Sequence, residues 1–159
     1  MRKPGQKFRK RAAMDKPFPL QLDEVFFPVQ EVRANPEHDP TGDRTGTRIK
    51  QVFNVQPIEG QVGLWGAELL IECDRDQSLN PPYFFNLQTF AMVRLDQQFD
   101  QATALSLVTT TCFSVLVGAA RERLLELTSR APWGRFMMGV VQLVNQTLPP
   151  SVTAASPDD

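Results

Sequence analysis

The longest run of helical spacing in the chain extends from Ala102 to Ser129. Two neighbouring rows of mostly apolar side chains recur there every three or four residues: Leu105, Val108, Cys112, Val115, Ala119 and Arg123, and beside them Leu116, Ala120, Leu124 and Leu127. This spacing predicts one amphipathic helix with a broad apolar face. At ~1.5 Å per residue the helix would be about 40 Å long. Thr103 is its expected N-cap, and Pro132 favours an end soon after Ser129.

The centre of this helix, from Cys112 to Ala120, is almost wholly apolar. Such a helix needs apolar cover on more than one side. It is either a core helix under a sheet or a helix shared with another subunit.

Four segments before the helix contain alternating apolar and polar positions: Pro17–Asn35, Arg48–Ile58, Val62–Cys73 and Tyr83–Leu95. In the first of them the alternation changes phase near Glu24, which is what a β-bulge produces, and Pro28 favours an edge strand or a break there. Short links between the strands favour an antiparallel meander or Greek-key sheet. Four strands followed by one long helix predict an α+β fold.

A loop rich in large apolar residues follows the helix between Arg130 and Gly139. Its side chains either cap the core or form an adaptable contact surface, because Met and aromatic side chains repack around varied partners. A second, shorter helix or an extended segment is expected to follow as far as Leu148.

Both ends of the chain are expected to be disordered. Residues 1–16 form an arm with seven basic residues and one acid, and residues 149–159 form a tail that ends in acids. The arm is either a solvated tail or a contact for RNA, an acidic protein or anionic lipid. Residues 17–148 are then the folded domain.

Composition adds three limits. The chain has 159 residues and a formal net charge of −1, so no global charge favours nucleic acid or a membrane surface. Cys73 and Cys112 lie in apolar runs without CxxC spacing. This pattern is typical of small buried side chains in a reduced, cytoplasmic protein. No apolar run reaches ~18 residues, so no membrane-spanning helix is expected.

The residues needed for catalysis are not grouped in any known motif. The single histidine, His38, lies in a loop and is expected to be exposed, and no nucleophile motif, P-loop or dinucleotide fingerprint occurs. No His, Cys or carboxylate spacing matches a metal site. We therefore expect a binding or assembly module with no cofactor, and no enzyme.

The run from Cys112 to Glu122 resembles the SecB family of export chaperones. Cys112, Ala120, Arg121 and Glu122 match the family's pattern in place, and the following Leu127–Arg130 and Trp133–Gly134 are similar to its next turn. Two family prolines are replaced, by Phe113 and Gly118. The resemblance covers residues 17–148 and is specific between Cys112 and Leu143.

The resemblance implies a homotetramer that binds unfolded or export-bound polypeptides in apolar grooves without ATP. It also implies delivery to SecA, the motor of the Sec translocase. The expected client-binding residues are Phe27, Phe53, Val55, Trp133, Phe136, Met137 and Met138. The expected oligomer contacts on the helix are Cys112, Val115, Ala119, Arg121 and Glu122.

Other functions stay open. The acids on the strand faces, such as Glu68 and Glu72, are few compared with the acidic surface that the family uses for SecA. A SecB-like chaperone dedicated to one client, such as an antitoxin, would be the same kind of holdase. A structural or assembly protein, or a carrier of small apolar ligands, could use the same fold.

Overall fold

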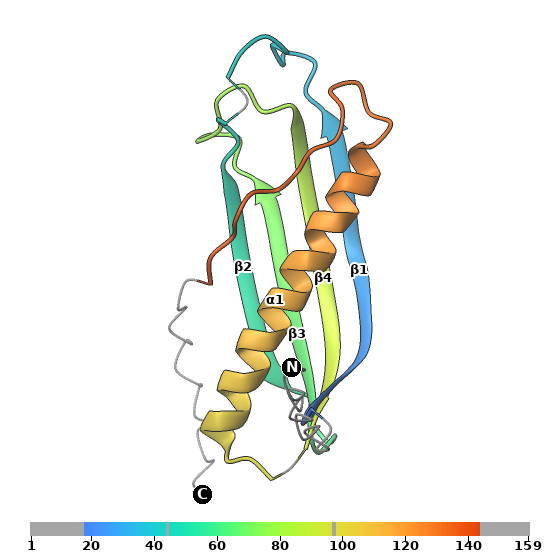
Figure 1. Ribbon diagram of the computed structural model, residues 1–159, viewed down its shortest axis with the longest axis vertical. Helices are drawn as coiled ribbons and strands as arrows, with labels where there is room; N and C mark the ends of the chain where they lie inside the picture. The colour runs from blue at the N-terminus through green and yellow to red at the C-terminus, as the bar shows by residue number, and fades with distance from the viewer. Residues whose placement is uncertain (1–17, 44, 97, 144–159) are drawn as a thin grey trace, which may run out of the picture.

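The computed structural model describes residues 18–43, 45–96 and 98–143; the predicted arm and tail lie outside these ranges. Four strands and one helix follow one another in the chain. They are β1 (Leu20–Ala34), β2 (Ile49–Pro57), β3 (Leu64–Cys73), β4 (Tyr83–Leu95) and α1 (Gln101–Thr128). Figure 1 shows α1 lying diagonally across one face of the sheet. The α+β order predicted from the sequence is confirmed.

The strands form one antiparallel sheet in the order β1-β4-β3-β2. This is a Greek-key order, because β2, β3 and β4 are consecutive and β1 returns beside β4. Every second residue of β4, from Tyr83 to Leu95, is buried under α1, and the residues between them face the other way. The alternation of the sequence therefore sets the face to which each side chain points.

Strand β1 is an edge strand and contains two irregularities in its pairing with β4. One lies between Leu22 and Glu24, at the predicted phase shift, and the other between Phe26 and Val29, around Pro28. Proline has no N–H to donate to a ladder and is tolerated at such a place. The sequence predicted the first bulge, and at Pro28 it predicted an edge strand or a break; the structure has both.

The side chains that α1 buries against the sheet recur every four positions, as Ala104, Val108, Cys112, Leu116, Ala120, Leu124 and Thr128, with Phe113 and Val117 beside them. This inner row combines members of both predicted rows. Val115 and Ala119 are only half-buried at its flank. The bounds of the helix are within one residue of those predicted.

The N-cap of α1 is Asp100 and not Thr103. The Asp100 carboxylate accepts the Thr103 N–H at 3.0 Å and the Thr103 hydroxyl at 2.6 Å. These hydrogen bonds lower the pKa of Asp100 below its usual range. Aspartate is a stronger N-cap than threonine, because its charge also suits the positive end of the helix dipole.

By length and composition alone, α1 could also cross a membrane. Buried helices of globular domains pass the same test. Here the inner row of the helix packs on the sheet, and Leu116 and Leu124 are fully buried there.

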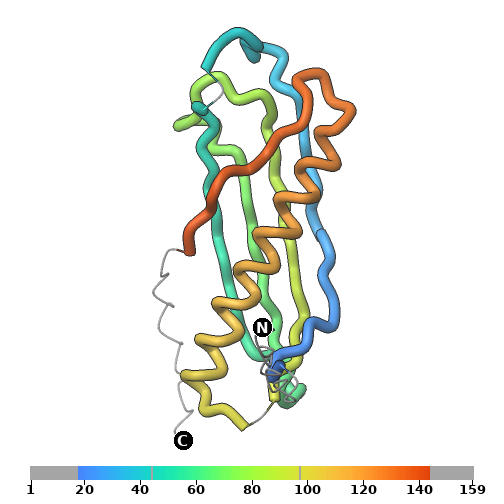
Figure 2. The backbone as a smooth tube through the Cα atoms, in the orientation of Figure 1, coloured from blue at the N-terminus to red at the C-terminus, as the bar shows by residue number. Residues whose placement is uncertain are grey.

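Residues 134–143, which we call the strap, follow the helix in an extended course. Figure 2 shows the strap crossing the α1 side of the sheet towards β2. None of the residues described in this stretch is helical, so the extended alternative applies as far as Leu143. The rest of the expected C-terminal helix, to Leu148, lies outside the described residues.

Candidate functional site

The turn after α1 is fixed to the sheet by the hydroxyl of Tyr83. This hydroxyl accepts the Trp133 N–H at 3.0 Å and donates to the Gly134 carbonyl at 2.7 Å. Gly134 has φ = 77°, a left-handed conformation that glycine adopts without strain. The Tyr83 ring is buried, and burial raises the pKa of its hydroxyl. The turn is therefore held by a neutral group in the core.

Trp133 connects this turn to the loop after β1. Its indole Nε1–H donates to the Asn35 carbonyl at 2.9 Å, and its ring lies 5.2 Å from the His38 ring. His38 is only 8% exposed, and its Nδ1 lies 3.0 Å from the Asn80 carbonyl, to which a protonated Nδ1 donates. The expectation that His38 is exposed was wrong. It packs between two loops that are distant in the sequence.

An open hollow of about 430 Å³ lies beside Trp133, and we call it the aromatic hollow. Its principal lining side chains are His38, Tyr83, Trp133, Arg135, Phe136 and Met137. Met137 is 69% exposed at the rim, although large apolar side chains are usually buried. The hollow thus combines hydrogen-bonded aromatic walls with an exposed apolar rim side chain and one cation.

The strap is held between α1 and β2 by side-chain to backbone hydrogen bonds. Arg121 donates from Nε to the Met138 carbonyl at 3.0 Å and from Nη2 to the Gly139 carbonyl at 3.1 Å. Further along, the side-chain amide of Gln51 donates to the Gln142 carbonyl. Met138 is 1% exposed and belongs to the core.

A second hollow, of about 520 Å³, lies where the end of the strap meets β2, and we call it the edge hollow. Val140 lines it and is 90% exposed. Thr47 Oγ1 and Gln51 Oε1 are buried nearby without a hydrogen-bond partner among the described residues. The strand on this side, β2, is one of the two edges of the sheet. An edge strand offers unpaired backbone groups to an added chain.

The two hollows bring together only some of the predicted client-binding residues. Trp133, Phe136 and Met137 line the aromatic hollow. Phe53 is instead buried in the core, where its ring meets that of Phe113 edge-on at 5.2 Å, and Met138 is buried with it. In this conformation neither side chain is accessible to a client.

Phe27 and Val55 lie outside both hollows as partly buried side chains packed against the core. Sequence reasoning missed Val140 and the buried polar atoms of Thr47 and Gln51. Val140 stands in an apolar run, so its exposure has no local signal.

The predicted oligomer contacts also separate into two groups. Cys112 faces the sheet and is 1% exposed, and burial raises the pKa of its thiol to about 11. Arg121 is engaged with the strap of its own chain. Val115 and Ala119 are half-buried and Glu122 is exposed, so these three remain accessible to another subunit.

The fold defined by this sheet, helix and strap is that of the SecB-like chaperones. The structure is similar to that of the Mycobacterium tuberculosis SecB-like chaperone Rv1957, solved in complex with a ChAD peptide from the antitoxin Rv1956 HigA1. The TM-score is 0.57 at 11% sequence identity, over 79% of this chain and 93% of that chain.

A protein of unknown function from Streptococcus agalactiae matches less well, with a TM-score of 0.40 at 14% identity over 76% of this chain and 97% of that chain. No protein-family model matches the sequence, and neither does any curated protein.

Proposed function

We propose that this protein is an ATP-independent chaperone that holds unfolded polypeptides on the α1 side of its sheet. The observation that carries the proposal is the pair of hollows at the two ends of the strap, each with an exposed apolar side chain, Met137 in one and Val140 in the other. An extended client along the strap reaches both hollows. Many weak contacts along one chain give avidity without sequence specificity.

The binding energy would come mainly from burial of client side chains in the aromatic hollow, at ~25 cal/mol per Å² of apolar surface. Backbone hydrogen bonds to the free edge of β2 would add to it, because an extended chain can extend a sheet at its edge. The buried Thr47 and Gln51 oxygen atoms lie beside that edge and would accept hydrogen bonds from the added chain. No nucleotide takes part in this mechanism.

A chaperone dedicated to one kind of client is a specific form of this proposal. The structurally similar Rv1957 was solved with a peptide from an antitoxin. By analogy, this chain would hold an antitoxin-like partner. The SecB resemblance adds a second form, in which the chain delivers its clients to SecA. In either form we propose a homotetramer that acts in the cytoplasm.

The test is suppression of aggregation of a chemically unfolded model protein, without nucleotide, at about one tetramer per client. Light scattering should fall in proportion to the chaperone added. A large excess that leaves the scattering unchanged would overturn the general holdase. Binding of an antitoxin peptide in that case would establish the dedicated form.

The same protein preparation can distinguish a carrier of small apolar ligands from a chaperone. A hydrophobic dye should bind the native protein and be displaced by unfolded client. Displacement by small apolar molecules alone, and not by client, would favour the carrier.

A further inference from the structure

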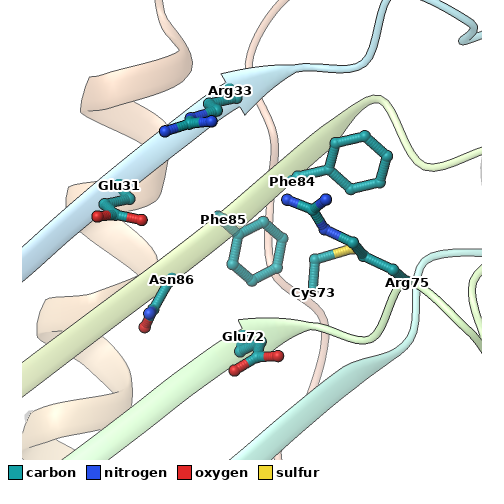
Figure 3. A pocket seen from close by; sticks show the side chains of 8 residues that line it. All are labelled: Glu31, Arg33, Glu72, Cys73, Arg75, Phe84, Phe85 and Asn86. Carbon is teal, nitrogen blue, oxygen red and sulfur yellow. The ribbon is translucent and has the colours of Figure 1, made fainter.

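The face of the sheet away from α1 contains a hollow of its own, of about 250 Å³, where β1 and β3 end. Six side chains give it its chemistry: Glu31, Arg33, Glu72, Arg75, Phe84 and Asn86. Figure 3 shows Asn86 between the two glutamates, and the Arg75 guanidinium near Phe84. This charged hollow is separated from the strap by the thickness of the sheet.

The charges in the hollow are ordered by the strand register. Glu31 and Glu72 are both paired with Asn86, so an acid, an amide and an acid stand in one row across three strands. In the next row Arg33 is paired with Phe84, and the guanidinium of Arg75 lies 4.4 Å from the centre of the Phe84 ring. Two residues along a strand span roughly 6.6 Å, so a positive row lies that far from a negative one.

The charges in the hollow do not form ion pairs with each other. Elsewhere Arg94 binds Asp23 at 2.8 Å and Lys50 binds Asp74 at 3.4 Å. Among the described residues, neither arginine of the charged hollow is in an ion pair. The Asn86 Oδ1 atom is buried and accepts no hydrogen bond there. A buried acceptor without a donor costs about 1–3 kcal/mol unless something else fills the place.

We propose that the charged hollow docks an extended segment of a partner protein in which an acidic and a basic side chain stand two positions apart. In an extended chain such side chains point the same way at roughly 6.6 Å, the spacing of the two rows. The carboxylate binds between Arg33 and Arg75. The basic side chain donates to Asn86 Oδ1 and to the glutamates.

Charge complementarity favours this partner over simpler ones. A phosphate or a wholly acidic peptide would be attracted by the two arginines and repelled by Glu31 and Glu72 in the same hollow. A wholly basic peptide would be attracted by the two glutamates and repelled by the two arginines. The surface is distinct from the proposed client site, and either can fail without the other.

The test uses nuclear magnetic resonance on the full-length chain. The side-chain N–H signals of Arg33, Arg75 and Asn86 are followed while three blocked pentapeptides are added, with the central motifs Glu-Thr-Lys, Glu-Thr-Glu and Lys-Thr-Lys. We expect saturable shifts of all three signals with Glu-Thr-Lys, weakened by added salt. The double variant Arg33→Glu, Arg75→Glu should bind that peptide about tenfold more weakly and prefer Lys-Thr-Lys.

Arg130→Glu is the matched control, because Arg130 is an exposed arginine outside the charged hollow. It should leave the titration unchanged. Equal shifts with all three peptides, or tighter binding of Glu-Thr-Glu, would overturn the mixed-charge partner. The proposal would also be overturned if the double variant Arg33→Glu, Arg75→Glu bound Glu-Thr-Lys as tightly as the unchanged protein does. Aggregation suppression by the variant reports on the client site separately.

Discussion

The hydroxyl of Thr128, in the last turn of α1, accepts the backbone N–H of Phe136 at 2.8 Å. The same hydroxyl donates to the Leu124 carbonyl at 2.7 Å, and Thr128 is fully buried. One side chain therefore joins the end of the helix to the start of the strap. The position of the aromatic hollow depends on this link.

Thr128→Val tests the link, because valine keeps the shape and removes the hydroxyl. The Phe136 N–H then lies in a partly buried place without an acceptor, and the free energy of unfolding should fall by about 1–3 kcal/mol. Urea denaturation measures the loss, and hydrogen exchange of the Phe136 amide should become faster. Thr110→Val, at an exposed position of α1, is the control and should change neither quantity. An unchanged Phe136 exchange rate would mean that other contacts hold the strap.

Tyr83→Phe should loosen the turn without disturbing the core around the ring. Only the hydroxyl that binds Trp133 and Gly134 is lost. In a Trp65→Phe background, the fluorescence of Trp133 should shift to longer wavelength as the indole becomes more exposed. The free energy of unfolding should fall by about 1–3 kcal/mol. Identical spectra with and without the hydroxyl would contradict this role.

Stability should fall above pH 9 because of buried thiols. Burial raises the pKa of Cys112 from 9.0 to about 11. Between these values the unfolded chain has lost the proton and the folded chain keeps it, so the free energy of unfolding decreases as the pH rises. Below pH 9 this contribution is fully present.

Urea unfolding at pH 8, 9 and 10 measures the slope. Cys112→Ala should make it shallower without abolishing it, because burial also raises the pKa of Cys73 and Tyr83. Equal slopes for the two proteins would show that Cys112 does not contribute.

The sequence was most informative where one face of an element is buried throughout. Burial alternates without a break along β4 and from Ala67 onwards in β3, and the faces of both strands follow from that period. His38 had no such signal, because its neighbours Asn80 and Trp133 lie 42 and 95 positions away in the chain. Long-range packing of a loop cannot be inferred from local composition.

The candidate site was only partly predictable for a related reason. Apolar composition marked Met137 and Met138 equally, yet one is exposed and the other is buried. The difference comes from Arg121, whose hydrogen bonds to two successive carbonyls fix the course of the strap. A long side chain that binds backbone groups 17 and 18 positions away leaves no periodic pattern.

The exposed apolar side chains of the strap should matter for clients and not for stability. Met137→Ser with Val140→Ser should weaken binding of an unfolded client about tenfold, because two apolar contacts are lost. The urea midpoint should stay unchanged, since both side chains are exposed. Val62→Ser, at an exposed apolar residue in the β2–β3 turn, is the control. Fluorescence anisotropy of a labelled, permanently unfolded client measures the affinity, and equal affinity would exclude the strap from the site.

Gly118 tests whether the outer face of α1 joins subunits. It is exposed in the helix, and a Cβ atom added there meets nothing within 4 Å. Glycine inside a helix costs about 1 kcal/mol relative to alanine, so in an isolated subunit both Gly118→Ala and Gly118→Arg should raise the free energy of unfolding. In the proposed homotetramer, close packing at this face would accept the methyl group and exclude the arginine.

Light scattering after size exclusion should therefore give a tetramer for Gly118→Ala and smaller species for Gly118→Arg. A tetramer in both variants would show that the subunits meet through another surface. If the unchanged protein is a monomer, the homotetramer is no longer part of the proposal. The two hollows of a single chain would then have to bind the client without other subunits.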